Sequence, residues 1–126
     1  TDRIDLHVKQ HLKKADRNRD FIKRYLLSII EEYPDWVSTV SFYSALHYVD
    51  ALLATHGLHW IHHEERNRDV SSLMPEIRNE YLNLYDLGRN SRYGNIDDIP
   101  SVDDAKQAVN TDLPKIEEFV KSRLQS

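Results

Sequence analysis

Apolar and small side chains fill nearly every position of the chain between Pro34 and Thr55. A helix that exposes one side to water shows a single apolar stripe, whereas this segment is apolar almost all the way round. It is about long enough to span a bilayer, but polar side chains interrupt it at Ser38, Thr39, Ser41, Ser44, His47 and Asp50. The pattern therefore predicts a buried central helix, contacted by neighbours on several sides, and no membrane span.

The first 33 residues carry an apolar face at spacings of three and four, formed by Ile4, Val8, His11, Ala15, Asn18, Ile22, Tyr25 and Ile29 and widened by Leu12, Leu26, Ile30 and Tyr33. This periodicity predicts one amphipathic helix, roughly from Asp2 to Glu32. Pro34 disfavours helical geometry at Tyr33, and Asp35 is expected to cap the next helix.

Two further helical regions follow the break at Gly57. The first is expected to start near His63, with Glu64 and Glu65 in its first turn, and to pause near Ser71 and Ser72 because of Pro75. From Pro75 the chain resumes a helix that places on one side Ile77, Tyr81, Leu84, Tyr85, Gly88 and Arg92.

Residues 94–100 form a predicted loop, and Ser101 with Asp104 resembles a capping box for the last helix. That helix is expected to bury Val102, Ala105, Val109, Ile116, Val120 and Leu124 and to be interrupted at Thr111 by Pro114. The predicted fold is all-α, an antiparallel bundle of four main helices with additional short helical segments, and residues 1–126 are predicted to form a single domain.

Composition narrows the possible functions. The net charge of −4 gives no global reason to bind nucleic acid, although a local basic patch is compatible with it. One such patch is the polar side of the first helix, with Lys13, Lys14, Arg17, Arg19 and Lys23, for which a solvated surface is the simpler interpretation. The absence of cysteine excludes disulfides and thiolate metal sites. The charged, amphipathic N-terminal stretch does not have the pattern of a signal peptide, and we expect a cytoplasmic protein.

Four histidines crowd the segment after the central helix, and His56, His59 and His63 are candidate metal ligands, with Glu64 as a further oxygen ligand. Gly57 is expected to break the helix that would align them, and their spacing matches no known metal signature. A polar loop is the favoured interpretation, and no metal or other cofactor is predicted.

His47 lies on the face of the central helix that also carries Val40, Tyr43 and Ala51, so it is expected to be at least partly buried. A buried imidazole needs hydrogen-bond partners, and Tyr43, Ser44 and Asp50 lie within a helical turn. A structural role is favoured over a catalytic or ligand-binding one.

The segment from Leu87 to Gly94 ends a helix with two arginines, of which Arg92 is predicted to point inward. A buried guanidinium must pair with a carboxylate, a phosphate or backbone carbonyls, and the candidates are Asp50 or Asp86 within the chain and an RNA or nucleotide phosphate outside it. Arg66, Asn67 and Arg68 form a second small cationic group, for which a solvated helix surface is the simpler interpretation. No phosphate loop, nucleophile elbow or HExxH zinc pair is present.

Four stretches together resemble the HEPN domain family, a helical bundle of prokaryotic toxin and defence systems. They are PDW after the first helix, FYSALHYVDALLATHG in the central helix, HHEERNRDV at the start of the third, and YLNLYDLGRNSRYG before the last. The resemblance implies a homodimer, or pairing with a nucleotidyltransferase-type partner.

Catalytic HEPN proteins are metal-independent RNases that use an arginine, a polar residue and, a few residues later, a histidine. Arg89 and Asn90 match the start of that motif, but Gly94, Asn95 and Ile96 stand where the histidine belongs. The catalytic histidine of the family therefore has no counterpart in this chain.

Three hypotheses follow. The favoured one is a non-catalytic HEPN-like module that dimerises or pairs with a partner and binds nucleotide or RNA, with the binding candidates Arg89, Asn90, Arg92, Tyr93, His63 and Arg66. The second is a divergent RNase in which His47 or His63 supplies the acid or base beside Arg89. The third is a plain helical interaction bundle, which a buried Arg92–carboxylate pair would favour.

Overall fold

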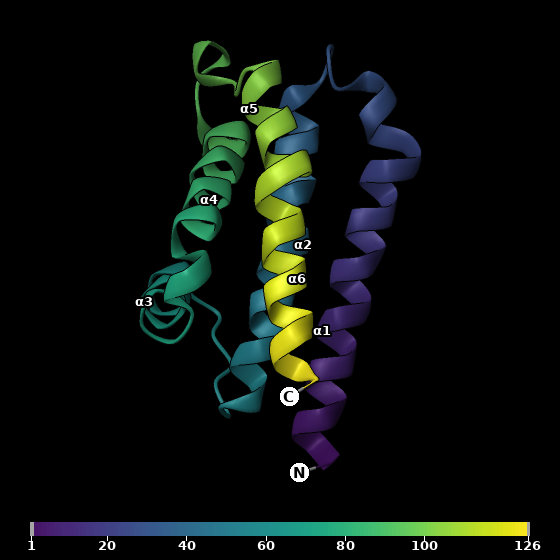
Figure 1. Cartoon of the computed structure of the whole chain (residues 1–126). Coiled ribbons are helices and arrows are strands. Elements are labelled where there is room, and N and C mark those ends of the chain that lie inside the picture. Colours follow the sequence, from purple (N-terminus) through teal and green to yellow (C-terminus); the bar gives the residue numbers. More distant parts are fainter. Residues whose placement is uncertain (1, 126) are drawn as a thin grey trace.

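The long helix α2 (Pro34–Thr55) lies in the middle of the molecule, and α1, α4 and α6 pack against it (Figure 1). The structure, a computed structural model, describes residues 2–125, and the side chains of residues 3–125. Helices α1 and α4 run in one direction and α2 and α6 in the other. The remaining bounds are α1 (Asp2–Phe21), α3 (His63–Leu73), α4 (Arg78–Tyr93), α5 (Val102–Gln107) and α6 (Leu113–Leu124).

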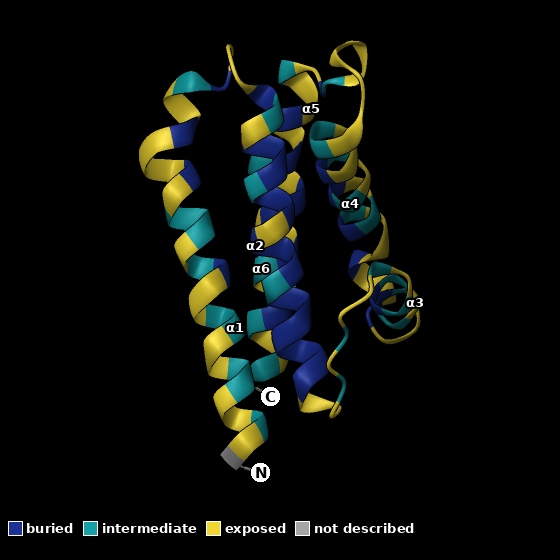
Figure 2. Ribbon diagram, turned by 180° about the vertical axis from the view of Figure 1, so that it is seen from behind, coloured by how far each residue is buried: buried dark blue, intermediate teal, exposed yellow. Residues whose placement is uncertain are grey.

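Sixteen of the 22 residues of α2 are buried, which confirms the predicted central helix (Figure 2). Burial on several sides follows from its nearly uniform apolar pattern. The expected role of Asp35 is wrong in detail: the helix begins at Pro34, and Asp35 lies in its first turn without capping it. Proline is favoured at the first helical position because no partner exists there for a backbone N–H.

The first helical region is continuous but changes its winding after Phe21, through one π-helical turn, η1 (Ile22–Leu26), and a 3₁₀ turn, η2 (Leu27–Ile29). An α-helix turns through more than one full circle in four residues, so the wider π turn keeps Ile22, Leu26 and Ile30 directed at the core. The same change leaves Tyr25 and Tyr33 exposed, contrary to the sequence-based expectation.

The second half of the chain follows the predicted order. Helix α3 begins at His63 and ends at Leu73, and a 3₁₀ turn, η3 (Pro75–Ile77), precedes α4. After a second 3₁₀ turn, η4 (Ile96–Asp98), Ser101 and Asp104 form the expected capping box of α5. A π-helical turn, η5 (Ala108–Asp112), precedes α6 and its Pro114, where the interruption was predicted.

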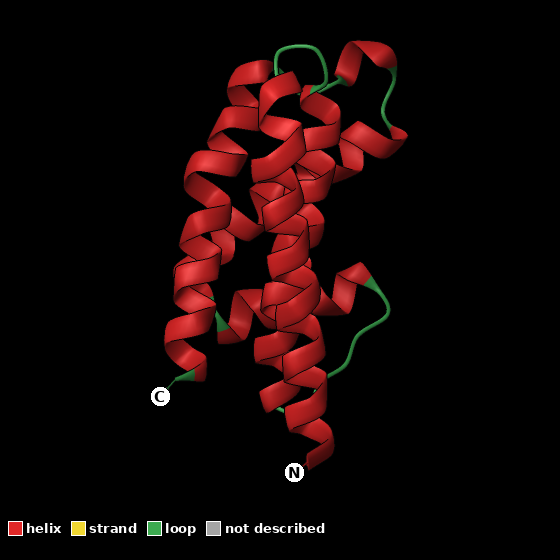
Figure 3. Cartoon of the chain, turned by 90° about the vertical axis from the view of Figure 1, so that its right-hand side faces the viewer, coloured by secondary structure: helices red, strands yellow, loops and turns green. Residues whose placement is uncertain are grey.

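The predicted all-helical class is confirmed, since the described residues contain no strand (Figure 3). None of the helices among them is long and apolar enough to cross a membrane.

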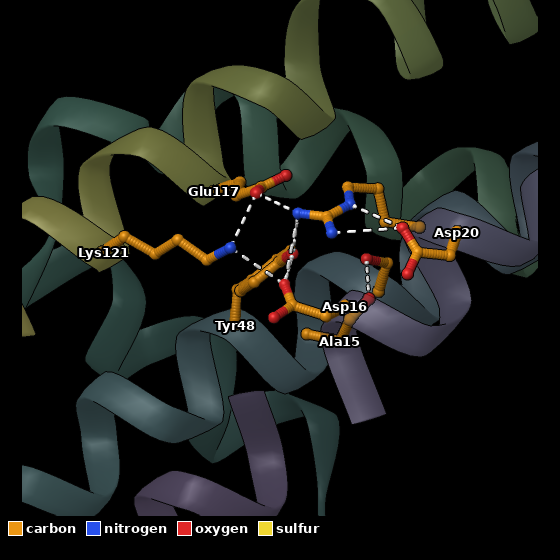
Figure 4. Close-up of polar contacts among 8 residues, drawn as sticks. Ala15, Asp16, Asp20, Tyr48, Glu117 and Lys121 are labelled. Carbon is orange, nitrogen blue, oxygen red and sulfur yellow. Dashed lines mark hydrogen bonds and ion pairs between the residues drawn. The ribbon is translucent and has the colours of Figure 1, made fainter. Parts of the chain in front are cut away.

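A network of charged side chains ties α1 to α2 and α6 (Figure 4). The hydroxyl of Tyr48 on α2 donates to Asp16, and Lys121 on α6 binds the same carboxylate at 3.0 Å. Arg19 pairs with Glu117 and with Asp16, so it is no part of a solvated basic face. Partial burial acts to raise the pKa of Asp16, but hydrogen bonds from Tyr48 and Lys121 and the charges of Lys121 and Arg19 outweigh it, and the pKa is lowered.

This network predicts a specific loss of stability in acid. A lowered pKa means that Asp16 contributes stability that is present above the pKa of an unfolded aspartate, about 3.9, and is lost as the pH falls through the folded-state value. In urea unfolding between neutral pH and about pH 3, the wild type should therefore lose more stability than Asp16→Asn. An exposed control, Asp97→Asn, should follow the wild type. Parallel pH profiles for all three proteins would contradict this account.

Candidate functional site

Polar side chains form a line across the middle of the molecule, from α1 over α2 to α3. His11 on α1 contacts His47 on α2, and Asp50, one turn further along α2, pairs with Arg66 on α3. Arg66 in turn contacts His63 at the start of α3. Residues far apart in the sequence are thus brought together at the one side of α2 that is not fully covered by apolar neighbours.

His47 is half-buried, as predicted, but its hydrogen-bond partner differs from the expected ones. Its Nδ1 lies 3.1 Å from Nδ1 of His11, and the two rings stack with centroids 5.4 Å apart. Burial, together with repulsion from His11, lowers the pKa of His47 to about 4. Burial also lowers the pKa of His11. Both imidazoles are therefore neutral at physiological pH.

Arg66 is buried in an ion pair, so the expectation of a solvated helix surface is wrong for this residue. Its Nε donates to one carboxylate oxygen of Asp50 at 2.8 Å and one Nη donates to the other at 3.3 Å. The same Nη donates to the backbone carbonyl of Trp60 at 2.6 Å. The side chains of Arg66 and Asp50 are only 5% and 9% exposed. Removing two charges from water costs free energy, and the ion pair with its additional hydrogen bonds compensates for this cost.

The turn after α2 brings the Trp60 carbonyl into place. Gly57 has φ of 73°, and the backbone N–H groups of Gly57 and Leu58 bond to the carbonyls of Ala54 and Leu53. This pair of bonds is a Schellman motif, which needs the left-handed residue that glycine supplies. The indole N–H of Trp60 donates to Asp69 and holds the loop against α3.

Arg92, near the end of α4, has aromatic partners in place of a carboxylate. Its guanidinium carbon lies 5.3 Å from the ring centre of Phe42, 5.1 Å from that of Tyr43 and 5.2 Å from that of Tyr93. Its Nε and one Nη are buried without a hydrogen-bond partner. Pairing with Asp50 or Asp86, one of the two alternatives that the sequence left open, is absent among the described contacts, and Asp50 is held by Arg66.

Gly88 permits this arrangement of α4 against α2. A Cβ at this position would lie 2.8 Å from Cβ of Phe42, closer than packed carbon atoms approach. The missing side chain therefore lets α4 pack closely against α2 one turn before Arg92.

His63 lies between the two arginines. Its ring packs against Phe42 and Tyr85, with centroids 5.8 and 5.4 Å apart, and Nη1 of Arg66 is 3.2 Å from its Nδ1. Burial and the positive charges of Arg66 and Arg92 lower its pKa, which Asp50 only partly opposes.

Two of the other sequence candidates, Arg89 and Asn90, lie outside this cluster, whereas the ring of Tyr93 contacts Arg92. Arg89 and Asn90 are exposed on α4, and Tyr93 is 78% exposed. His47 and Arg89 are the catalytic pair considered for a divergent RNase. No contact between these two residues occurs in the part of the chain that the structure describes.

The histidines proposed as metal ligands do not converge. His56 is exposed, whereas the ring of His59 lies beside those of His7 and His11, at 5.7 and 6.0 Å between centroids. Three other groups, His11, His47 and Asp50, have ligand atoms within 4.8 Å of one another.

Sequence reasoning missed His11, Phe42 and Tyr85 as parts of the site. The signal for His11 was present, because it is a histidine in the apolar face of the first helix, where a polar residue needs a partner. The aromatic residues carried no such signal, since their pattern is that of ordinary core positions.

Comparisons of the chain with protein-family models, with curated proteins and with solved structures found no match. What the site does has to follow from its own geometry and chemistry.

Removing one member of the buried ion pair should destabilise the fold strongly. Arg66→Ala leaves the carboxylate of Asp50 buried and uncompensated, which costs about 3–5 kcal/mol of unfolding free energy. Arg68→Ala is the matched control, because that arginine on the same helix is 63% exposed and its loss should cost less than about 1 kcal/mol. Urea unfolding measures both, and equal losses in the two variants would refute the assigned role of the pair.

Proposed function

We propose that this chain is an HEPN-like module, a bundle of four main helices that binds a phosphate-bearing ligand, nucleotide or RNA, at Arg92 without cleaving it. The observation that carries the proposal is the state of the Arg92 guanidinium, in which Nε and one Nη are buried with no hydrogen-bond partner. Buried charged donors without an acceptor are costly. A phosphate supplies anionic oxygen acceptors for arginine N–H donors, and such charge-assisted hydrogen bonds are among the stronger ones in proteins.

The surroundings of Arg92 support this ligand class. Tyr43 and Tyr93 flank the guanidinium and are 38% and 78% exposed. Exposed aromatic faces beside an arginine are the elements on which proteins stack unpaired bases.

The local charge favours an anion although the whole chain is negative. Asp50 is neutralised by Arg66 in the buried pair, and the lowered pKa of His63 leaves that imidazole neutral at physiological pH. Arg92 is therefore the uncompensated charge of this cluster. Exposed Arg89, one turn earlier on α4, is a second cation on the same helix.

The two other hypotheses have less support. A plain interaction bundle would leave Arg92 stabilised by its aromatic contacts alone, with two buried donors unsatisfied. A divergent RNase would use His47 or His63 as acid or base. The pKa of His47, about 4, makes it a weak base at neutral pH, and burial with the charges of Arg66 and Arg92 also lowers the pKa of His63.

We further propose that the chain forms a homodimer or pairs with a nucleotidyltransferase-type protein, as the HEPN resemblance implies. Exposed aromatic side chains near the α1–α2 connection offer an apolar surface for either: Phe21, Tyr25, Tyr33 and Trp36. Aromatic residues are enriched in protein interfaces.

The binding site predicts that Arg92→Ala weakens binding of a short, fluorescein-labelled single-stranded RNA by about ten- to a hundredfold in fluorescence anisotropy. Loss of charge-assisted hydrogen bonds to a phosphate accounts for a change in affinity of this size. Arg123→Ala is the matched control, since Arg123 also stacks on an aromatic ring, Phe119, and pairs with Glu76 on a different face of the chain. Competition with ATP and with inorganic phosphate distinguishes a nucleotide site from an RNA site.

Equal RNA binding by the wild type and Arg92→Ala would refute the phosphate site. A large loss of stability in Arg92→Ala without any loss of binding would assign the residue to the fold. Electrophoresis of the same RNA after incubation shows whether it stays intact, and cleavage by the wild type would favour the RNase hypothesis instead.

The proposed dimer predicts a solution mass of two chains in sedimentation equilibrium. Trp36→Ala, which removes a side chain that is 58% exposed, should shift the equilibrium towards the monomer. Ile61→Ala is the control, because Ile61 is exposed on the loop before α3. A monomeric wild type at all concentrations tested would exclude the homodimer.

A further inference from the structure

Two imidazoles and one carboxylate, contributed by α1 and α2, lie close to one another and next to Arg66. They are His11 on α1 and His47 and Asp50 on α2, and their ligand atoms all lie within 4.8 Å of one another. We infer that these three side chains bind a divalent first-row transition-metal ion such as Zn²⁺, with water in the open coordination position. The site is independent of the proposed ligand at Arg92.

The separation of the two imidazoles suits a shared ion. Nδ1 of His11 and Nδ1 of His47 are 3.1 Å apart. Two nitrogens bound to one tetrahedral Zn²⁺ at about 2.0–2.1 Å lie roughly 3.3 Å from each other. An ion would therefore take the place of the proton that now joins the rings, and a carboxylate oxygen of Asp50 already lies within 4.8 Å of a ring nitrogen of each histidine.

The chemistry of the donors fits the same class of metal. Two imidazoles and one carboxylate form the donor set of catalytic zinc sites and of non-haem iron sites with open positions. Imidazoles bind metals in their neutral form, and both rings are neutral at physiological pH because burial disfavours their charged forms.

The residues around the triad orient the ligands. Arg66 holds both oxygens of Asp50, and ligating carboxylates are commonly fixed by such hydrogen bonds. The positive charge of Arg66 also opposes a cation, so affinity should be lower than at a site with two carboxylates. Further imidazoles lie next to the triad, since the rings of His59 and His11 are 6.0 Å apart.

Such an ion would join α1 to α2. Because it binds the folded chain and not the unfolded one, it should raise the melting temperature by about 5–10 °C at a free Zn²⁺ concentration of roughly one hundred times Kd.

The test is a titration of Zn²⁺ into untagged protein that has been freed of metal by chelation and dialysis. Isothermal titration calorimetry should show one equivalent per chain, and the melting temperature should rise. His11→Gln and His47→Gln should each lose affinity by about a hundredfold or more, a conservative figure given that loss of a supporting hydrogen bond alone costs 10- to 100-fold. His56→Gln, an exposed histidine outside the triad, should bind like the wild type.

A second measurement does not depend on the variants being folded. In ¹⁵N spectra of the histidine rings of the wild type, Zn²⁺ should shift the resonances of His11 and His47 and leave His56 in place. The proposal is overturned if no saturable binding occurs, if His56→Gln binds as weakly as the triad variants, or if Zn²⁺ shifts only rings outside the triad. None of these outcomes bears on binding of RNA at Arg92.

Discussion

The buried ion pair between Asp50 and Arg66 joins the central helix to α3 and to the loop that precedes it. Asp50 is a charged residue within an almost wholly apolar helix, and its burial is tolerable only because Arg66 satisfies both of its oxygens. The loop has to bring the Trp60 carbonyl to the same guanidinium, which requires the left-handed turn at Gly57. The position of α3, and with it that of His63, depends on this pair.

The same pair explains why Arg92 differs from the other buried arginine. Asp50 is one of the two carboxylates that the sequence left open as partners of Arg92. Since Arg66 holds it, the guanidinium of Arg92 contacts three aromatic rings instead. Arg66 therefore supports the fold, whereas Arg92 keeps two donors without a hydrogen-bond partner, which we propose bind a ligand. The two neutral histidines lie close to the same carboxylate, so Asp50 belongs to the proposed cation site as well as to the ion pair with Arg66.

Most of the helices could be predicted from the sequence, because apolar periodicity, prolines and glycines mark them directly. Pro34, Gly57 and the Ser101–Asp104 cap lie at helix ends as expected. The π-helical turn η1 could not be foreseen, since it arises from packing that keeps Ile22, Leu26 and Ile30 on the core side. The site was only partly predictable: its residue types were identified, but the pairing of His11 with His47 and of Asp50 with Arg66 depends on how helices distant in sequence meet.

The contrast between the two arginines is the central claim, and the side-chain Nε–H resonances of Arg92 and Arg66 test it within one sample. When a short single-stranded RNA is titrated into ¹⁵N-labelled protein, the Arg92 resonance should shift and saturate, while that of Arg66, held by Asp50, should stay in place. Arg92→Lys assigns the first resonance by its disappearance. A titration in which Arg92 does not respond, while exposed arginines such as Arg17 do, would contradict the account.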